Sequence, residues 1–490
     1  MPLIKPTNYL LSKSGLVWLA NNKRVITLQV VSSYRSELIK LAKLTGPILV
    51  AQVTQTLMSV VDTLMAGQAG AVDLAAVSVG GSIWLPAILL MFGLALALAP
   101  VISHLHGANE QWRIANITQQ GFYSCALGGL LAVATVLAAP LLLDVMDVEA
   151  QFRAVTLDYL GYIIWGLPAL LIYVVLRNFC EGLSHTMPSL VISSIGLLVN
   201  IPANYIFIHG HFGVPAMGGA GCGLASAIVL WVMGLSMLLY VYSAKRFREI
   251  KLFSRIYWPN WDDVVYLIRL GFPIAMAIFF EVSLFAAVAL LIAPLGPEVV
   301  SSHQIAMNIS ALVYMVPMSL SMAITLRVGF ALGAGTPANA MRSYRLAMVL
   351  GMSFAAVNGI GMYLGGSWLA GLYTDNQAII VLAAQLMGLA AIFTLSDTFQ
   401  AINIGTLRGY KDTNMAMLIT FVSYWPFGLS VGAILGLTDW LVPAMGAAGF
   451  WIGFITGLTC AAILLSWRLR YIVKHHRNSD HSLASEATVE

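Results

Sequence analysis

The feature that most constrains this chain is a succession of long apolar runs. One of them, residues 270–294, contains Glu281 as its only ionisable residue. A run of about 20 apolar residues is long enough to cross the hydrocarbon core of a bilayer as a helix. Across the whole chain 59% of the residues are hydrophobic and 9% are charged, whereas an ordinary soluble protein has about 25% charged residues. These values predict a polytopic membrane protein.

Cutting the sequence at charged or Gly/Pro-rich breaks gives twelve apolar segments, each long enough to span a bilayer. The predicted spans are 41–66, 76–102, 119–143, 157–180, 188–208, 219–243, 265–293, 301–328, 344–366, 378–404, 414–437 and 447–470. We therefore expect an all-α membrane protein with twelve transmembrane helices. The four cysteines lie inside these runs without metal-ligand or redox spacing, so we interpret them as small hydrophobic residues.

The positions of Lys and Arg predict the orientation. If the spans alternate, all of the 25 basic residues except Arg153 fall on one side, and this set includes Arg177, Arg327 and Arg408, which we assign to loops. Cytoplasmic loops of membrane proteins are enriched in Lys and Arg. Both termini are therefore expected in the cytoplasm, with the protein in the cell (inner, cytoplasmic) membrane.

The two halves of the sequence repeat. Sliding the sequence so that Pro47 meets Pro273 also brings Gly107 onto Gly333. One residue further, GLSHT meets GYKDT, and after one more VPAMGGAG meets VPAMGAAG. Each half has six spans, so both enter the membrane in the same direction. Two six-helix bundles related by a pseudo-twofold axis along the membrane normal are expected, an arrangement typical of secondary transporters.

The predicted organisation follows from the repeat and from the polar breaks. We interpret the first segment as a cytoplasmic arm rather than a signal peptide and the last as disordered. The segments are a cytoplasmic N-terminal arm at 1–37, an N-lobe at 38–243, a cytoplasmic inter-lobe loop at 244–264, a C-lobe at 265–472 and a disordered cytoplasmic tail at 473–490.

Three carboxylates fall well inside predicted spans, namely those of Asp62, Glu281 and Asp397. A charge at the bilayer centre costs about 2.5–3.5 kcal/mol on insertion scales, and no Lys, Arg or His lies deep in a predicted span to pair with these acids. One interpretation is a protonated, hydrogen-bonded packing element. The other is a site for a proton or a metal cation, or an anchor for a cationic solute.

Polar side chains recur at helical spacing on four of the spans. A single polar stripe serves equally well as interhelical glue, but four stripes, two of which carry an acid, favour the walls of water-filled cavities. The stripes are Gln52, Gln55, Ser59 and Asp62; Ser193, Asn200 and Asn204; Ser301, Gln304 and Asn308; and Thr394, Asp397 and Gln400.

Several of these residues belong to longer motifs. The motifs include VVDTLMAG (60–67), EGLSHTMP (181–188), GLLVNIPANYIFIHGHFG (196–213), FFEVSLF (279–285), HQIAMNIS (303–310), LSDTFQ (395–400), LRGYKDT (407–413) and PAMGAAGFWIGF (443–454). Through them the chain resembles the multidrug and toxic compound extrusion (MATE) family, in its NorM-like branch, over about residues 36–472. The resemblance implies a cation-coupled antiporter that exports drugs and dyes, built from two lobes in a V that alternate between inward- and outward-facing states.

The resemblance also implies roles for individual residues. Glu281 and Asp397 match the family's C-lobe cation site, for Na⁺ or H⁺, and Asp62 matches its N-lobe acid. The further candidates are Phe393, Gln304 and Asn308 beside the C-lobe site, and Gln55, Asn200 and Asn204 beside the N-lobe acid. NorM-like members often carry Tyr where this chain has Phe393. The Phe ring offers a π face but no hydroxyl ligand, which slightly favours H⁺ coupling over Na⁺.

Other expectations concern the moving parts and the partners. Pro47 lies fifteen residues before Asp62 and is a candidate hinge that bends the first span, although proline is also common in membrane helices. Expected partners are small cationic or aromatic molecules and membrane lipid, with no nucleic acid. No cofactor is expected besides the coupling ion, and we expect a functional monomer.

Two alternative functions belong to other classes. A flippase for lipid-linked precursors would need a cationic cavity for a pyrophosphate, whereas the predicted deep charges are acidic. An intramembrane enzyme with an aspartyl pair would need a Gly-x-Gly-Asp frame, which Asp62 and Asp397 lack. No His/Glu zinc motif occurs in a predicted span, so the protein is not expected to be an enzyme.

Overall fold

A computed structural model describes the chain apart from residues 1–8, 13–14, 20–24, 28–33, 146–148 and 487–490. In the described part, twelve helical segments are long and apolar enough to cross a membrane. The prediction of an all-α polytopic membrane protein with twelve spans is thereby confirmed. The helices extend beyond the predicted apolar segments at most of their ends, because helical residues continue past the hydrocarbon core.

The first six spans are formed by eight α-helices: α1 (Tyr34–Ala69), α2 (Ala71–Leu96) continued by α3 (Leu98–Gly107), α4 (Gln111–Val145), α5 (Ala150–Ile163) joined through η1 (Ile164–Gly166) to α6 (Leu167–Gly182), α7 (Met187–His209) and α8 (Gly218–Ser243). A linker that contains η2 (Lys245–Phe247) follows.

The second six spans are α9 (Trp261–Ile292) with η3 (Ala293–Leu295), α10 (Pro297–Gly333), α11 (Pro337–Gly371), α12 (Gln377–Gly409), α13 (Thr413–Val422) with the π-helical η4 (Ser423–Leu429) and α14 (Ser430–Leu437), and α15 (Ala447–Glu486). Local sequence sets several ends. The side chains of Asn260 and Asn376 cap α9 and α12 by accepting from Asp262 N and Ala378 N, and Gly210, with φ 75°, ends α7.

The two ends of the chain depart from the expected picture. Before α1, the short strands β1 (Tyr9–Ser12), β2 (Gly15–Leu19) and β3 (Val25–Thr27) form an antiparallel sheet in the order β1-β2-β3. The rest of the predicted N-terminal arm up to residue 33 lies outside the described residues. At the other end, α15 continues to Glu486 where a disordered tail was expected from residue 473. Extending an existing helix needs no new nucleus, so polar residues join it at small cost.

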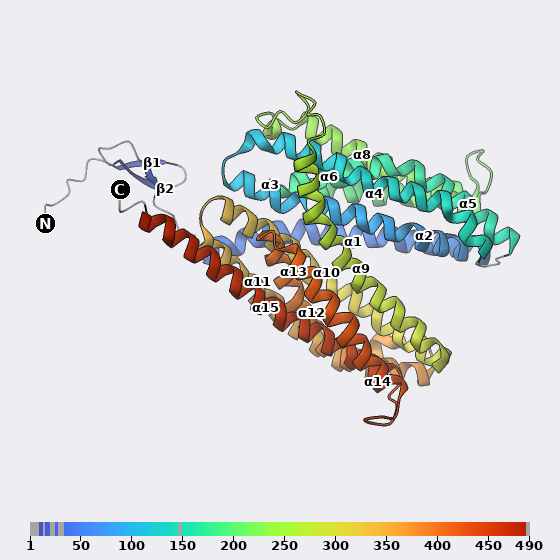
Figure 1. Cartoon of the computed structure of the whole chain (residues 1–490). Coiled ribbons are helices and arrows are strands. Elements are labelled where there is room, and N and C mark those ends of the chain that lie inside the picture. The colour runs from blue at the N-terminus through green and yellow to red at the C-terminus, as the bar shows by residue number, and fades with distance from the viewer. Residues whose placement is uncertain (1–8, 13–14, 20–24, 28–33, 146–148, 487–490) are drawn as a thin grey trace.

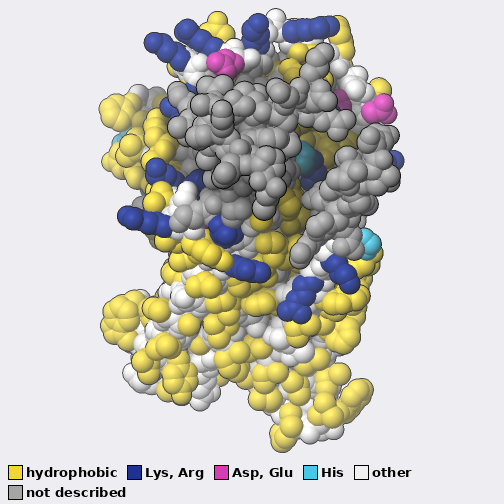
Figure 2. Space-filling view, turned by 90° about the vertical axis from the view of Figure 1, so that its left-hand side faces the viewer, with side chains coloured by type: hydrophobic (Ala, Val, Ile, Leu, Met, Phe, Trp, Pro, Cys, Tyr) yellow, Lys and Arg dark blue, Asp and Glu magenta, His cyan; other side chains and the backbone are white. Residues whose placement is uncertain are grey.

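The helices form two bundles arranged as a V (Figure 1). Helices α1–α8 make the N-lobe and α9–α15 the C-lobe, and the lobes converge at the end of the molecule where α1 begins and α15 ends. We call this the terminal end. There α3 packs against α10, and the Ser103 hydroxyl donates to the Leu326 carbonyl at 2.6 Å. Lys and Arg side chains are spread over this end, while hydrophobic side chains cover the part below it (Figure 2).

The first part of α1 packs in the C-lobe, and the first part of α9 packs in the N-lobe. Leu41, Leu44 and Ile48 of α1 belong to the hydrophobic core of the C-lobe, whereas Leu267 and Ile274 of α9 belong to the core of the N-lobe. The packing boundary therefore differs from the predicted lobe boundaries at residues 38 and 265. The predicted boundaries assign the first six spans to one lobe and the last six to the other. A count of spans does not show which helix faces pack together.

Candidate functional site

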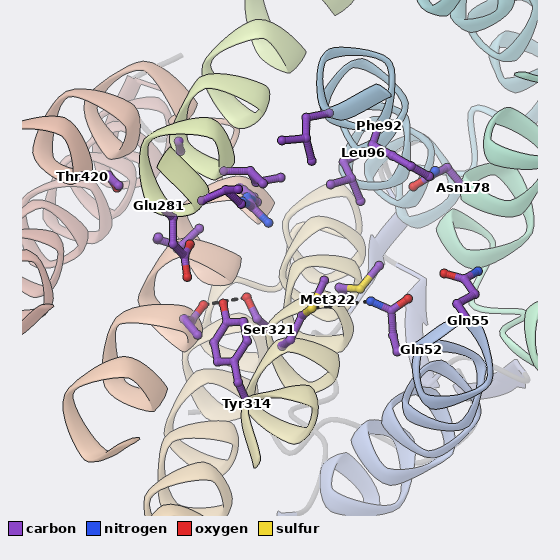
Figure 3. A pocket seen from close by; sticks show the side chains of 18 of the residues that line it. Gln52, Gln55, Phe92, Leu96, Asn178, Glu281, Tyr314, Ser321, Met322 and Thr420 are labelled. Atoms are coloured by element: carbon purple, nitrogen blue, oxygen red, sulfur yellow. Dashed lines mark hydrogen bonds between the residues drawn. The ribbon is translucent and has the colours of Figure 1, made fainter. Parts of the chain in front are cut away.

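A cavity of about 440 Å³ lies between the lobes. Figure 3 shows Gln52, Gln55 and Asn178 on its N-lobe side and Glu281 with Thr420 on the opposite side. Its wall is mainly apolar, with a few polar groups, which is the usual character of a small-molecule site. The lining residues are Gln52, Gln55, Leu89, Phe92, Leu96, Val174, Arg177, Asn178, Ala277, Ile278, Glu281, Val282, Phe285, Tyr314, Met318, Ser321, Met322, Ala401, Ile404, Arg408 and Thr420.

The cavity carries both signs of charge. Glu281 on α9 shares it with Arg408 on α12 and Arg177 on α6. Arg177 forms an ion pair with Glu181 at 2.8 Å and donates to Gln52 Oε1 at 3.3 Å. Arg408 and Glu281 interact electrostatically. A solute in this cavity therefore meets one carboxylate and two guanidinium groups.

Three arginines correct the assignment of basic residues to loops. The sequence assigned all three to loops, but Arg177 and Arg327 lie inside α6 and α10, and Arg408 lies in the last turn of α12. Arg177 and Arg327 are buried, at 6% and 7% exposed. His303 of α10 is also buried, at 2%. Arg177 and Arg327 fall in the last turn of their predicted spans and Arg408 falls just beyond one, so hydropathy alone cannot distinguish a loop arginine from one that continues the helix inside the protein.

Acidic and phenolic oxygens gather in the C-lobe beside the cavity. Glu281 and Asp397 interact electrostatically with each other, and both interact with Tyr314 and Tyr424. Asp397 is 5% exposed and does not line the cavity. The structure thus brings together the two predicted C-lobe acids, one at the cavity wall and one behind it.

The remaining C-lobe candidates are placed differently. Phe393 is buried in an aromatic cluster, with its ring centroid 5.6 Å from that of Trp451 and 6.3 Å from that of Phe454. Gln304 and Asn308 are exposed, lie outside the cavity lining, and hydrogen bond to each other at 3.0 Å. Helical spacing placed these two on one face correctly, but it did not show what that face meets.

The N-lobe acid has a well-defined shell of donors. Oδ1 of Asp62 accepts from Asn200 Nδ2 at 2.8 Å and from Asn204 Nδ2 at 2.6 Å. Its Oδ2 accepts from the Ser226 hydroxyl at 3.4 Å. Three residues from α7 and α8 thus hold one carboxylate of α1, and the two asparagines grouped with Asp62 in the sequence lie against it.

This carboxylate lines a second cavity of about 260 Å³ within the N-lobe. Gln55 and Phe92 line both cavities, so they form the partition between them. Gln55 donates to the Tyr173 hydroxyl at 3.1 Å. Pro47 lies inside α1, between its first turns and these polar residues.

Sequence reasoning missed several polar residues of these sites. Ser226 lies in a helix rich in Gly, Ala and Ser, where it resembles a packing residue. Tyr173 and Tyr314 are single aromatic residues in apolar runs and Tyr424 lies in an aromatic-rich one, and nothing in the sequence separates them from ordinary membrane packing. For Arg177 and Arg408 the available signal was their position at the end of a predicted span, just inside it for Arg177 and just beyond it for Arg408, which fits an inward-facing helix end as well as a loop.

Comparison with known proteins identifies the family. The MatE family profile matches residues 47–206 and 273–434, once in each lobe, which confirms the predicted internal repeat. A probable multidrug resistance protein NorM of Idiomarina loihiensis is 68% identical over 472 residues, covering 95% of this chain and 100% of that protein. The multidrug resistance protein MdtK of Yersinia pseudotuberculosis is 47% identical, covering 91% of this chain and 97% of that protein.

Solved structures share the fold. The eukaryotic MATE transporter AtDTX14 aligns with a TM-score of 0.79 at 20% identity, covering 91% of this chain and 99% of that one. An outward-facing multidrug resistance MATE transporter of the MOP superfamily aligns with a TM-score of 0.81 at 18% identity, covering 91% and 100%. These proteins are transporters rather than enzymes. The profile covers more than half of the chain, and its two copies coincide with the two bundles: the chain belongs to the MatE family.

Proposed function

We propose that this protein is a cation-coupled antiporter that exports cationic and aromatic drugs across the cytoplasmic membrane by alternating access. The observation that carries the proposal is the cavity between the lobes, with Glu281 in its wall. Its mainly apolar lining suits planar organic solutes, and its carboxylate supplies a counter-charge for a cation. The relatives that carry the names NorM and MdtK are described as multidrug resistance proteins.

The coupling ion is proposed to bind at Glu281 and Asp397. Two carboxylates close enough to interact repel each other when both are ionised, so a proton or a Na⁺ ion is held between them. The nearby oxygens of Tyr314 and Tyr424 are hard ligands of the kind that Na⁺ accepts. An inward-moving cation gains about 2.3 kcal/mol per 100 mV of membrane potential, which is available to drive the solute outward. No cofactor is needed for this cycle.

The orientation follows from the basic residues. Lys and Arg gather at the terminal end (Figure 2), so this end is proposed to face the cytoplasm, with both termini. The lobes diverge away from it (Figure 1). The conformation described here then corresponds to the outward-facing state of a functional monomer. In that state the inter-lobe contacts at the terminal end separate the cavity from the cytoplasm.

Reconstitution in liposomes tests the proposal. Dye efflux is measured from vesicles containing wild type or Glu281→Gln, with a Na⁺ gradient and a pH gradient imposed separately. We expect efflux driven by one gradient and lost in the variant, and that gradient identifies the ion. Gradient-driven efflux that survives Glu281→Gln would move the coupling to Asp62 or Asp397. Absence of gradient-driven dye movement in the wild type would reject the antiporter.

One observation favours a second candidate, a lipid-precursor flippase. Arg177 and Arg408 give the cavity the cationic groups that a pyrophosphate requires, although Arg177 is already paired with Glu181. The same vesicles decide between the two functions. A fluorescent lipid pyrophosphate that changes leaflet without a cation gradient would support the flippase and count against the antiporter.

A further inference from the structure

The first part of α1 is held in the C-lobe by a buried carboxylate. Glu37 is 0% exposed. It accepts from Arg327 Nη2 of α10 at 3.0 and 2.8 Å, one bond to each carboxylate oxygen, and from the Ser343 hydroxyl of α11 at 2.8 Å. Lys40, one turn along α1, donates to it as well at 2.8 Å. Removing this carboxylate from its donors would leave buried charges unpaired, which is among the costliest changes that a protein interior undergoes.

Apolar packing holds the same segment in place. Leu41, Leu44 and Ile48 are 0–4% exposed and belong to the core of the C-lobe. The aromatic ring of Tyr34 lies 4.9 Å from the guanidinium carbon of Arg342. We call residues 34–46 the foot of α1. Ile48, just beyond Pro47, still packs in the C-lobe core, whereas Asp62, further along the helix, is bound by α7 and α8 of the N-lobe.

The repeat places a second carboxylate, half-buried and bonded to the opposite lobe, at the start of α9. The shift that carries Pro47 onto Pro273 carries Glu37 onto Asp263. Asp263 Oδ2 accepts from Asn116 Nδ2 of α4 at 3.1 Å, and α4 is the N-lobe counterpart of α11. Residues 261–272, the foot of α9, place Leu267 and Leu270 in the core of the N-lobe.

The linker before α9 is tied to the same helix of the N-lobe. Gln119 donates to the carbonyls of Leu252 and Arg255 at 2.7 and 2.8 Å and accepts from Tyr257 N at 2.8 Å. Gln120 donates to the Trp258 carbonyl and accepts from Asn260 N. The foot of α9 therefore continues a segment that is already fixed to the N-lobe.

We propose that Glu37 and Asp263 are a symmetry-related pair of anchors that keep each foot in the opposite lobe throughout the transport cycle. The lobes then move by bending α1 at Pro47 and α9 at Pro273. Proline removes one helical hydrogen bond and bends a helix locally, so bending there breaks fewer contacts than extracting a buried foot. The inference rests on the alternating access proposed above, and it assigns a positioning role to two carboxylates that bind neither ion nor drug.

Cross-linking distinguishes an anchor from a contact that must break. In a Cys460→Ser background, Tyr34→Cys with Arg342→Cys joins the foot of α1 to the C-lobe through a short, reducible bis-thiosulfonate linker. The matched control, His106→Cys with Phe330→Cys, joins α3 to α10 directly between the lobes, where the ring centroids are 5.5 Å apart. We expect the foot cross-link to retain at least half of the export rate of its reduced form. The control cross-link should lower the rate at least tenfold, with recovery on reduction. A foot cross-link that stops export as completely as the control overturns the proposal.

A distance measurement gives a readout that does not depend on drug export. Spin labels at Asn109 and Ala338 report opening between the lobes, and labels at Ile39 and Ala338 report the position of the foot. We expect the first distance to change between ion-loaded and ion-free protein and the second to remain constant. If both distances change together, or if neither distance changes, the proposal that Glu37 and Asp263 act as anchors is wrong. If dye efflux fails but both distances behave as expected, the proposed drug substrates are rejected and the proposal of the anchors stands.

Discussion

Gly107 and Gly333 allow α3 and α10 to touch backbone to backbone where the lobes meet. A Cβ atom on Gly333 would lie 1.9 Å from the His104 carbonyl oxygen, and one on Gly107 would lie 2.2 Å from the Phe330 carbonyl oxygen. Both distances are far shorter than a van der Waals contact, so this approach requires residues without a Cβ. The two glycines are equivalent in the repeat, and the contact therefore lies close to the pseudo-twofold axis.

Replacing Gly333 with Ala should force α3 and α10 apart and lower stability by about 1–3 kcal/mol. Thermal unfolding of the purified protein in detergent measures the change. Gly361→Ala is the matched control, since it lies in α11 with nothing within 4 Å of its added Cβ. The control should be unchanged or up to about 1 kcal/mol more stable, because Ala favours helix over Gly. Equal stability of the two variants would contradict the close contact.

Asp62→Asn should reduce export while leaving the fold intact. The new amide oxygen still accepts from Asn200 and Asn204, which donate to Oδ1 in the wild type, but the negative charge is lost. The lost charge weakens the attraction for a bound cation, and a weakening of about 1.4 kcal/mol corresponds to about a tenfold effect, so we expect at least a tenfold lower efflux rate with unchanged thermal unfolding. Wild-type efflux from Asp62→Asn would make Asp62 a packing element.

Phe92→Ala should change which substrates are exported, because Phe92 separates the central cavity from the one that holds Asp62. We expect the efflux of a bulky dye to rise relative to that of a small cation, by about threefold or more. Leu89→Ala serves as control, since Leu89 lines only the central cavity. If the ratio of dye efflux to small-cation efflux changes similarly in both variants, Phe92 affects selectivity only through the volume of the central cavity.

Pro47→Ala should impair turnover and spare expression. Alanine supplies the hydrogen bond that proline lacks and straightens α1, so the bend needed between its foot and Asp62 becomes more costly. Efflux per molecule in liposomes, normalised to the amount of inserted protein, measures the effect. Full transport by the variant would reject Pro47 as a hinge.

The sequence alone determined the frame of this protein. Long apolar runs predict helices that cross a bilayer because an isolated backbone satisfies its hydrogen bonds in lipid only as a helix. The identities between the halves predict two matching bundles, which the two copies of the MatE profile confirm. The resemblance to the MATE family also placed Asn200 and Asn204 beside Asp62, where the structure has both of them donating to its carboxylate.

Tertiary structure decided which helix faces meet, because helical spacing places residues on a common face without showing what the face contacts. It exposed Gln304 and Asn308, which the sequence had placed beside Glu281. It also brought Arg177 and Arg408 into the cavity, although both had been assigned to loops. Finally, it seated Glu37 in the opposite lobe, a contact between residues that are far apart along the chain and whose pairing depends on three-dimensional packing.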